Sequence, residues 1–196
     1  MDSKAVAKAH GRLRVATQQL ENAAKAEWFE EFADSWYLFL VAAKNVYTTL
    51  EQGAKASAQS RQWFGARKNE RKSDPLLQYL FQARDDDEHG LAHVLKLEPG
   101  HWRLGAEGGM IVDRAVIEYG ELVEFKGRSK TGVPITYQET PPHPKLAAVT
   151  GRGNVTYHPP TEHKGQPLND TLPLAVGRLG LAYLSDLIQD AGARVA

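Results

Sequence analysis

The chain has 196 residues, with 24 Lys and Arg balancing 24 Asp and Glu and a hydrophobic content of 42%, a composition typical of a globular protein and not of a disordered one. The absence of cysteine excludes disulfides, thiolate catalysis and cysteine zinc sites. No apolar run is long enough to span a membrane and the N-terminus shows no export pattern, so we expect a cytoplasmic protein with no membrane partner.

Four helices are predicted in the first half of the chain, where apolar residues recur at helical spacing. They cover residues 3–26, 27–52, 57–71 and 75 to about 90. Ser73-Asp74-Pro75 is typical of a helix start, because a polar cap precedes a proline at the first helical position. The fourth helix ends at Gly90 or, in a second interpretation, continues through Leu95. The pair Pro99-Gly100 marks a boundary.

Residues 99–168 predict a β-rich section. Strands are expected at 110–112, 115–119, 122–125 and 133–137, with short ones at 146–150 and 155–157 and a basic turn at 127–132. Asp170-Thr171 then caps a last helix at about 172–191. The expected fold class is α+β, mostly α: a helical bundle at 1–98, the β-rich section at 99–168, and a C-terminal helix at 169–196 that packs back on the bundle.

The most informative motif is the run from Arg84 to His89, Arg-Asp-Asp-Asp-Glu-His, at the end of the fourth predicted helix. Histidine changes its charge near neutral pH, and a guanidinium group is a permanent fork of donors suited to phosphate. Together the two side chains can carry out acid–base chemistry on a phosphodiester without a metal. A second match to the same kind of spacing, from Arg152 to His158, lies in a Gly- and Pro-rich region and is interpreted as accidental.

The predicted helical bundle resembles the HEPN superfamily, whose motif is Arg-x(4–6)-His. As in that motif, a late helix carries an arginine, a polar residue, a short spacer and a histidine. The resemblance covers residues 3–93. It implies an RNA-directed protein of the defence or toxin type. The implied activity is RNA cleavage that needs no metal and no cofactor and leaves 2′,3′-cyclic phosphate ends. The resemblance implies that His89 is the general acid or base, that Arg84 binds the phosphate, and that Asp85 orients Arg84 or the substrate. A homodimer and an antitoxin-like protein partner are further expectations.

The alternative is a surface ion pair between Arg84 and Glu88, which lie four residues apart on one helix face. His89 would then only complement the helix dipole, and the protein would be a non-catalytic dimeric scaffold or interaction protein with an idle motif. Positions five apart lie roughly 140° apart around a regular helix, so Arg84 and His89 converge only if the arginine curls or the helix loosens. The acidic neighbours Asp86 and Asp87 also repel phosphate.

A basic stretch on the third predicted helix is a second candidate site. Arg61, Arg67 and Lys68 could follow a nucleic-acid backbone, and Trp63 offers a face on which a base could stack. A solvated helix face with one buried edge is the alternative explanation. The histidines show no recognised ligand spacing, so no metal site is expected.

Overall fold

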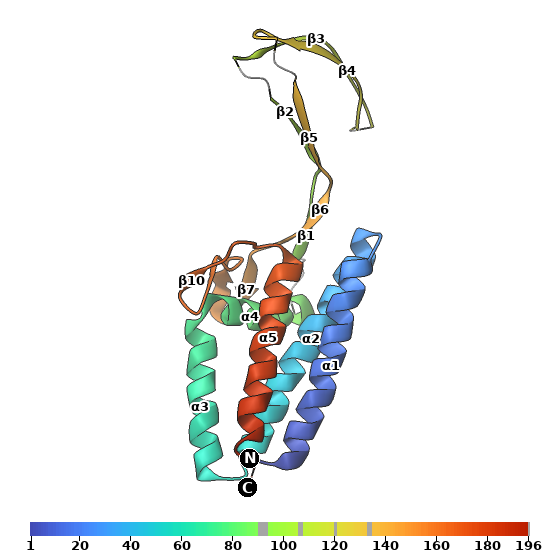
Figure 1. Ribbon diagram of the computed structural model, residues 1–196. Helices are drawn as coiled ribbons and strands as arrows, with labels where there is room; N and C mark the ends of the chain where they lie inside the picture. Colours follow the sequence, from blue (N-terminus) through green and yellow to red (C-terminus); the bar gives the residue numbers. More distant parts are fainter. Residues whose placement is uncertain (90–93, 106–107, 120, 133–134, 196) are drawn as a thin grey trace. The chain divides into compact units, whose positions relative to one another are not determined.

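The computed structural model describes residues 1–89, 94–105, 108–119, 121–132 and 135–195 (Figure 1). The protein is a mixed α+β chain. Its described α-helices are α1 (Ser3–Lys25), α2 (Phe29–Ala54), α3 (Ala58–Ser73), α4 (Pro75–His89) and α5 (Pro173–Gly192). The chain divides into two compact units, one formed by residues 1–97 with 144–196 and the other by residues 98–143.

The helical unit is built on α1 and α2, which pack along their length, with α5 against both of them (Figure 1). α3 and α4 pack on each other and on α2, and α4 also contacts α5. The apolar stripes of the helices meet in one core whose largest fully buried side chains include Trp36, Tyr79, Phe39, Leu40 and Ile188. Burial of these side chains is the main favourable contribution to folding of this unit.

The start of α4 follows from its sequence. The Asp74 carboxylate accepts a hydrogen bond from the Leu77 backbone N–H at 3.0 Å, and Pro75 occupies the first helical position, where its missing N–H costs nothing. The last helical residue is His89. The interpretation in which this helix continues through Leu95 is wrong, because Leu95 begins strand β1 (Leu95–Glu98).

Several short strands belong with the helices. β1 pairs with β6 (His143–Leu146), β7 (Val149–Gly151) with β8 (Val155–Tyr157), and β9 (Glu162–His163) with β10 (Gln166–Pro167). A 3₁₀ turn at Arg152–Asn154 links β7 to β8. β7 and β9 contact α4, and Leu146 and Val149 are buried in the core. The β-rich section expected at 99–168 is therefore divided, and its residues from 144 onward lie with the helices.

The second unit, residues 98–143, consists of two antiparallel ribbons. β2 (His101–Gly105) pairs with β5 (Thr136–Thr140), and β3 (Met110–Glu118) pairs with β4 (Glu121–Ser129). β3 joins the two strands predicted at 110–112 and 115–119, with an irregularity of register between Val112 and Arg114. The basic turn predicted from Gly127 is displaced, because β4 continues to Ser129. None of the residues described between 98 and 143 is buried.

Across the described part of the chain, no helix combines the length and the apolar character that a bilayer crossing requires.

Candidate functional site

The end of α4 carries a small network of charged side chains. Arg84 donates a hydrogen bond from Nη1 to Oδ1 of its neighbour Asp85 at 3.2 Å, and Nζ of Lys44 on α2 forms an ion pair with the same carboxylate oxygen. The side chains of Lys44, Asp85 and Arg84 are 17%, 27% and 20% exposed. Two cations, Lys44 and Arg84, therefore share the carboxylate of Asp85.

The charge state of Asp85 follows from its surroundings. Burial acts to raise the pKa of Asp85, but the hydrogen bond and charge of Lys44, together with those of Arg84, lower it below the usual value for an aspartate. Asp85 is consequently ionised at neutral pH. An ionised Asp85 accepts a hydrogen bond from the Arg84 guanidinium group.

The structure brings together two of the three predicted site residues, Arg84 and Asp85. The third, His89, is the last residue of α4, and its side chain lies outside the described residues. The side chain of Glu88, which the alternative pairs with Arg84, lies outside them as well. Arg84 contacts Asp85, its neighbour in sequence, and the pairing with Glu88 stays a prediction.

One of the two acidic residues expected to repel phosphate faces the protein interior. Asp86 is 8% exposed, and its Oδ2 accepts a hydrogen bond from the backbone N–H of Thr150 at 3.0 Å. This hydrogen bond connects β7 to α4. The side chain of Asp87 lies outside the described residues.

The stacking role expected of Trp63 is not available in this structure. The side chain is only 8% exposed, and its indole N–H donates to Oδ2 of Asp190 on α5 at 2.6 Å. The guanidinium carbon of Arg194 lies 5.3 Å from the ring centroid. Trp63 therefore attaches α3 to α5, and its ring is not presented to solvent.

The three predicted backbone-binding cations of α3 all have partners within the protein. Arg67 pairs with Glu70 at 2.6 Å, Lys68 pairs with Glu51 at 2.6 Å, and Arg61 donates to the backbone carbonyl of Lys55 at 2.9 Å. Exposed ion pairs of this kind contribute about 0–1 kcal/mol, so a phosphate could displace them at little cost. The ion pairs of Arg67 and Lys68 therefore do not prevent this face of α3 from contacting a nucleic-acid backbone.

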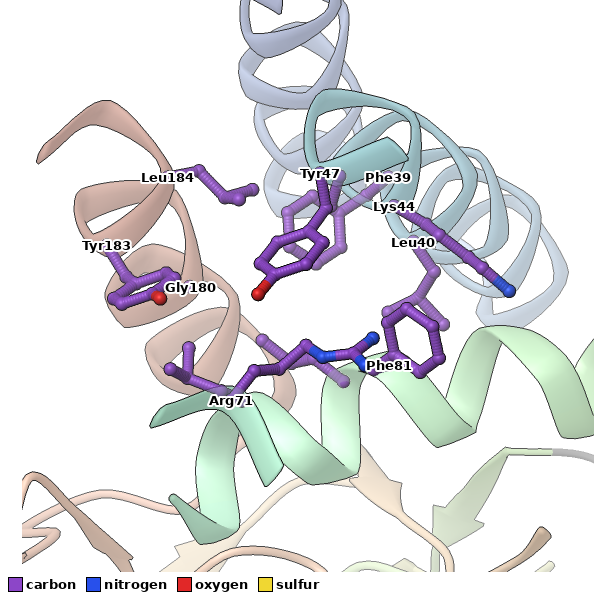
Figure 2. Close-up of a pocket in the computed structure, with 12 residues that line it drawn as sticks. Phe39, Leu40, Lys44, Tyr47, Arg71, Phe81, Gly180, Tyr183 and Leu184 are labelled. Atoms are coloured by element: carbon purple, nitrogen blue, oxygen red, sulfur yellow. The ribbon is translucent and has the colours of Figure 1, made fainter. Parts of the chain in front are cut away.

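A pocket that the sequence did not indicate lies among α2, α3, α4 and α5 (Figure 2). Arg71 borders it, with its guanidinium carbon 3.5 Å from the ring centroid of Phe81 and 4.9 Å from that of Tyr47. Tyr47 is only 5% exposed, and its hydroxyl group has no hydrogen-bond partner among the described residues. In the sequence Arg71 is only one of six positive residues between 55 and 72, and nothing local distinguishes it from the others.

Within the described ranges, no group of three or more His, Asp or Glu side chains is arranged to hold a metal ion. His163 and Asp74 are in contact at 3.0 Å, as a pair without a third ligand. Comparison of the chain with protein-family models, with curated proteins and with solved structures finds no match.

Proposed function

We propose that this chain is an RNA-directed protein of the HEPN kind that cleaves RNA without a metal, with Arg84, Asp85 and His89 as its site. The observation that supports the proposal most directly is the shared carboxylate of Asp85, which contacts both Arg84 and Lys44. The contact with Asp85 holds the Arg84 guanidinium group in position on the helix that also carries the histidine. Such a group suits a phosphodiester, whose charge grows as it is attacked.

The proposed reaction uses the ribose 2′-OH as the nucleophile. Its oxygen bonds to the adjacent phosphorus, its proton passes to a base, and the bond from phosphorus to the 5′-oxygen breaks as that oxygen takes a proton. His89 is the residue proposed to transfer these protons, because imidazole titrates near neutral pH. Arg84 neutralises the non-bridging oxygens, and Asp85 is a positioning residue that acts through Arg84.

A homodimer would resolve a geometric difficulty of this proposal. On a regular helix, Arg84 and His89 point roughly 140° apart. If two copies place their α4 ends against each other, Arg84 of one protomer can share a phosphate with the histidine of the other. Two histidines then also become available, one as the base and one as the acid.

The experiment that tests the proposal is incubation of the purified protein with single-stranded and structured RNA in excess EDTA. We expect cleavage that leaves 2′,3′-cyclic phosphate ends. Arg84→Ala and His89→Ala should each lower the rate by roughly 10²–10⁴-fold, the usual contribution of such groups. Asp85→Asn should lower it less, because the amide can still accept a hydrogen bond from Arg84.

The chain supplies a matched control in its second motif match. His158 is exposed and lies outside the proposed site, so His158→Ala should cleave RNA at the wild-type rate. Intact RNA with the wild-type protein, or an equal loss in His158→Ala and His89→Ala, would contradict the proposal. A dimer in sedimentation experiments together with intact RNA would favour the non-catalytic scaffold.

A further inference from the structure

We propose that the pocket among α2, α3, α4 and α5 binds a small organic anion, with its charged head on Arg71 and the Tyr47 hydroxyl and a short apolar tail in the pocket. This site is separate from the RNA-directed function proposed above and does not depend on it. Three features support the site: the donors of Arg71, the hydroxyl group of Tyr47, and the size and lining of the pocket.

Arg71 has donors that the protein does not use. Two other arginines on the helices around the pocket contact acidic side chains: Arg67 on α3 contacts Glu70, and Arg84 on α4 contacts Asp85. Arg71, by contrast, forms no hydrogen bond or ion pair with any residue that the structure describes, and its guanidinium lies over ring faces. Stacking holds the plane of the guanidinium while its N–H groups stay uncommitted. A carboxylate or phosphate can engage two of them at once.

The surroundings of Arg71 favour an incoming anion. Burial lowers the pKa of Arg71 from its usual value, which reflects the cost of holding this charge away from water, and Glu51 and Asp85 offset that cost only from longer range. Both of those carboxylates are bound to lysines, Asp85 to Lys44 and Glu51 to Lys68. The cation at the pocket therefore lacks a direct counter-ion, and a bound anion would supply one.

Tyr47 supplies the second observation. Its hydroxyl group is fully covered and unpartnered among the described residues, whereas the neighbouring tyrosines are bonded, Tyr79 to the Ala147 carbonyl at 2.7 Å and Tyr183 to Glu70 at 3.3 Å. Burial raises the pKa of Tyr47, so its hydroxyl stays protonated and remains a donor. Figure 2 shows this hydroxyl directed toward the space that Arg71 borders. Buried hydroxyls without partners are uncommon and costly, so a missing acceptor is the natural explanation.

The size and lining of the pocket define the rest of the ligand. The cavity volume is about 50 Å³, and most of its lining is apolar, including Phe39, Leu40, Leu77, Leu80 and Leu184. An apolar cavity of about 150 Å³ holds benzene. One of about 50 Å³ therefore suits a tail of a few carbon atoms and not a nucleobase. A short-chain carboxylate and a short alkyl phosphate both have this chemistry.

The test is calorimetric titration of the full chain with butyrate and with n-propyl phosphate, which differ in the head group. Acetate, which lacks the tail, and n-butanol, which lacks the charge, serve as control ligands. We expect one of the two tailed anions to bind at millimolar concentration or below, and both controls to bind at least tenfold more weakly. The Arg71 Nε–H resonance should shift in parallel with the heat of binding.

Three variants connect the binding to these residues. Arg71→Met should weaken binding roughly 10–100-fold, the range for hydrogen bonds to a charged group, and Tyr47→Phe by roughly 2–10-fold. Arg178→Met, at an exposed position of α5, should bind like the wild type. Tyr47→Phe keeps the ring, so its fold is retained even if that of Arg71→Met is not. No binding of either tailed anion, equal binding of n-butanol, or unchanged affinity in Tyr47→Phe would overturn the proposal.

Discussion

The carboxylate of Asp86 and the backbone N–H of Thr150 form a hydrogen bond of 3.0 Å that connects α4 to β7. This contact changes how the acidic run that follows Arg84 is understood. Asp85 is held between two cations and Asp86 faces inward, so these two adjacent acids have different structural roles. The carboxylates of Asp85 and Asp86 are therefore engaged within the protein, and these two residues are a weaker obstacle to phosphate than the sequence alone indicates.

Replacing Asp86 should destabilise the helical unit. Asp86→Ala leaves the Thr150 N–H without an acceptor in a partly buried position, and we expect a loss of about 1–3 kcal/mol in the free energy of unfolding. Asp86→Asn keeps an acceptor oxygen and should lose less. Urea unfolding measures both, with Asp186→Ala at an exposed position of α5 as the control, expected within about 0.5 kcal/mol of wild type. Equal midpoints for Asp86→Ala and Asp186→Ala would argue against this role.

Asp74 should make stability depend on pH in the acid range. Burial acts to raise the pKa of Asp74, but hydrogen bonds from the backbone N–H groups of Lys164 and Leu77 and from His163 lower it below its usual value. A carboxylate with a lowered folded-state pKa stabilises the protein above its unfolded pKa of about 3.9, and this contribution is lost as the pH falls through the folded-state value. Asp74→Asn should therefore be less stable than wild type at neutral pH but lose less stability below about pH 4. Parallel pH profiles of the urea midpoint would contradict the prediction.

Gly177 allows the close approach of α5 to α1 and α2. A Cβ atom added there would lie 2.7 Å from Cδ1 of Leu20 and 3.1 Å from Cζ3 of Trp36, which is fully buried. Gly177→Ala should cost about 1–3 kcal/mol through overpacking, despite the better helix propensity of alanine. Gly11→Ala on α1 meets nothing within 4 Å, and should stabilise by up to about 1 kcal/mol. Thermal unfolding should thus show shifts of opposite sign, and shifts of the same sign would exclude the packing explanation.

Two buried tyrosines should respond differently to loss of the hydroxyl group. Tyr79→Phe removes a hydrogen bond of 2.7 Å to the Ala147 carbonyl and should cost about 0.5–1.5 kcal/mol or more. Tyr47→Phe removes a hydroxyl that has no described partner, so without added ligand its stability should equal or exceed that of wild type. Chemical unfolding of both variants in an anion-poor buffer makes the comparison. A larger loss for Tyr47→Phe than for Tyr79→Phe would show that its hydroxyl already has a partner.

The helices could be predicted because each is long enough for its apolar spacing to repeat several times. The start of α4 was predictable too, since Asp74 and Pro75 act on the backbone next to them. The second role of Asp74, its contact with His163, joins residues 89 apart and has no local signal. β9 and β10 have two residues each, too few for an alternating pattern to show.

In the charged sites, too, contacts between residues far apart in the sequence could not be predicted. Arg84 and Asp85 are neighbours in sequence, so their contact was accessible to sequence reasoning, whereas Lys44 reaches Asp85 only because α2 packs on α4. The basic residues around Trp63 in the sequence are compatible both with an exposed stacking face and with one buried edge of a solvated helix, and the structure shows the second for Trp63. Its partner Asp190 lies on α5, 127 positions later.

The chain leaves the helical unit at Leu97 and returns to it at Pro144, in the paired strands β1 and β6, and none of the residues described between these points is buried. Among the described residues, the apolar burial that makes folding cooperative therefore belongs to the helical unit. The enthalpy of thermal unfolding should scale with the number of residues in the helical unit. It should therefore be lower than the value expected if all 196 residues shared one core. Changes in the length or sequence of the segment between the two strands should therefore disturb the core of the helical unit less than changes within the helices.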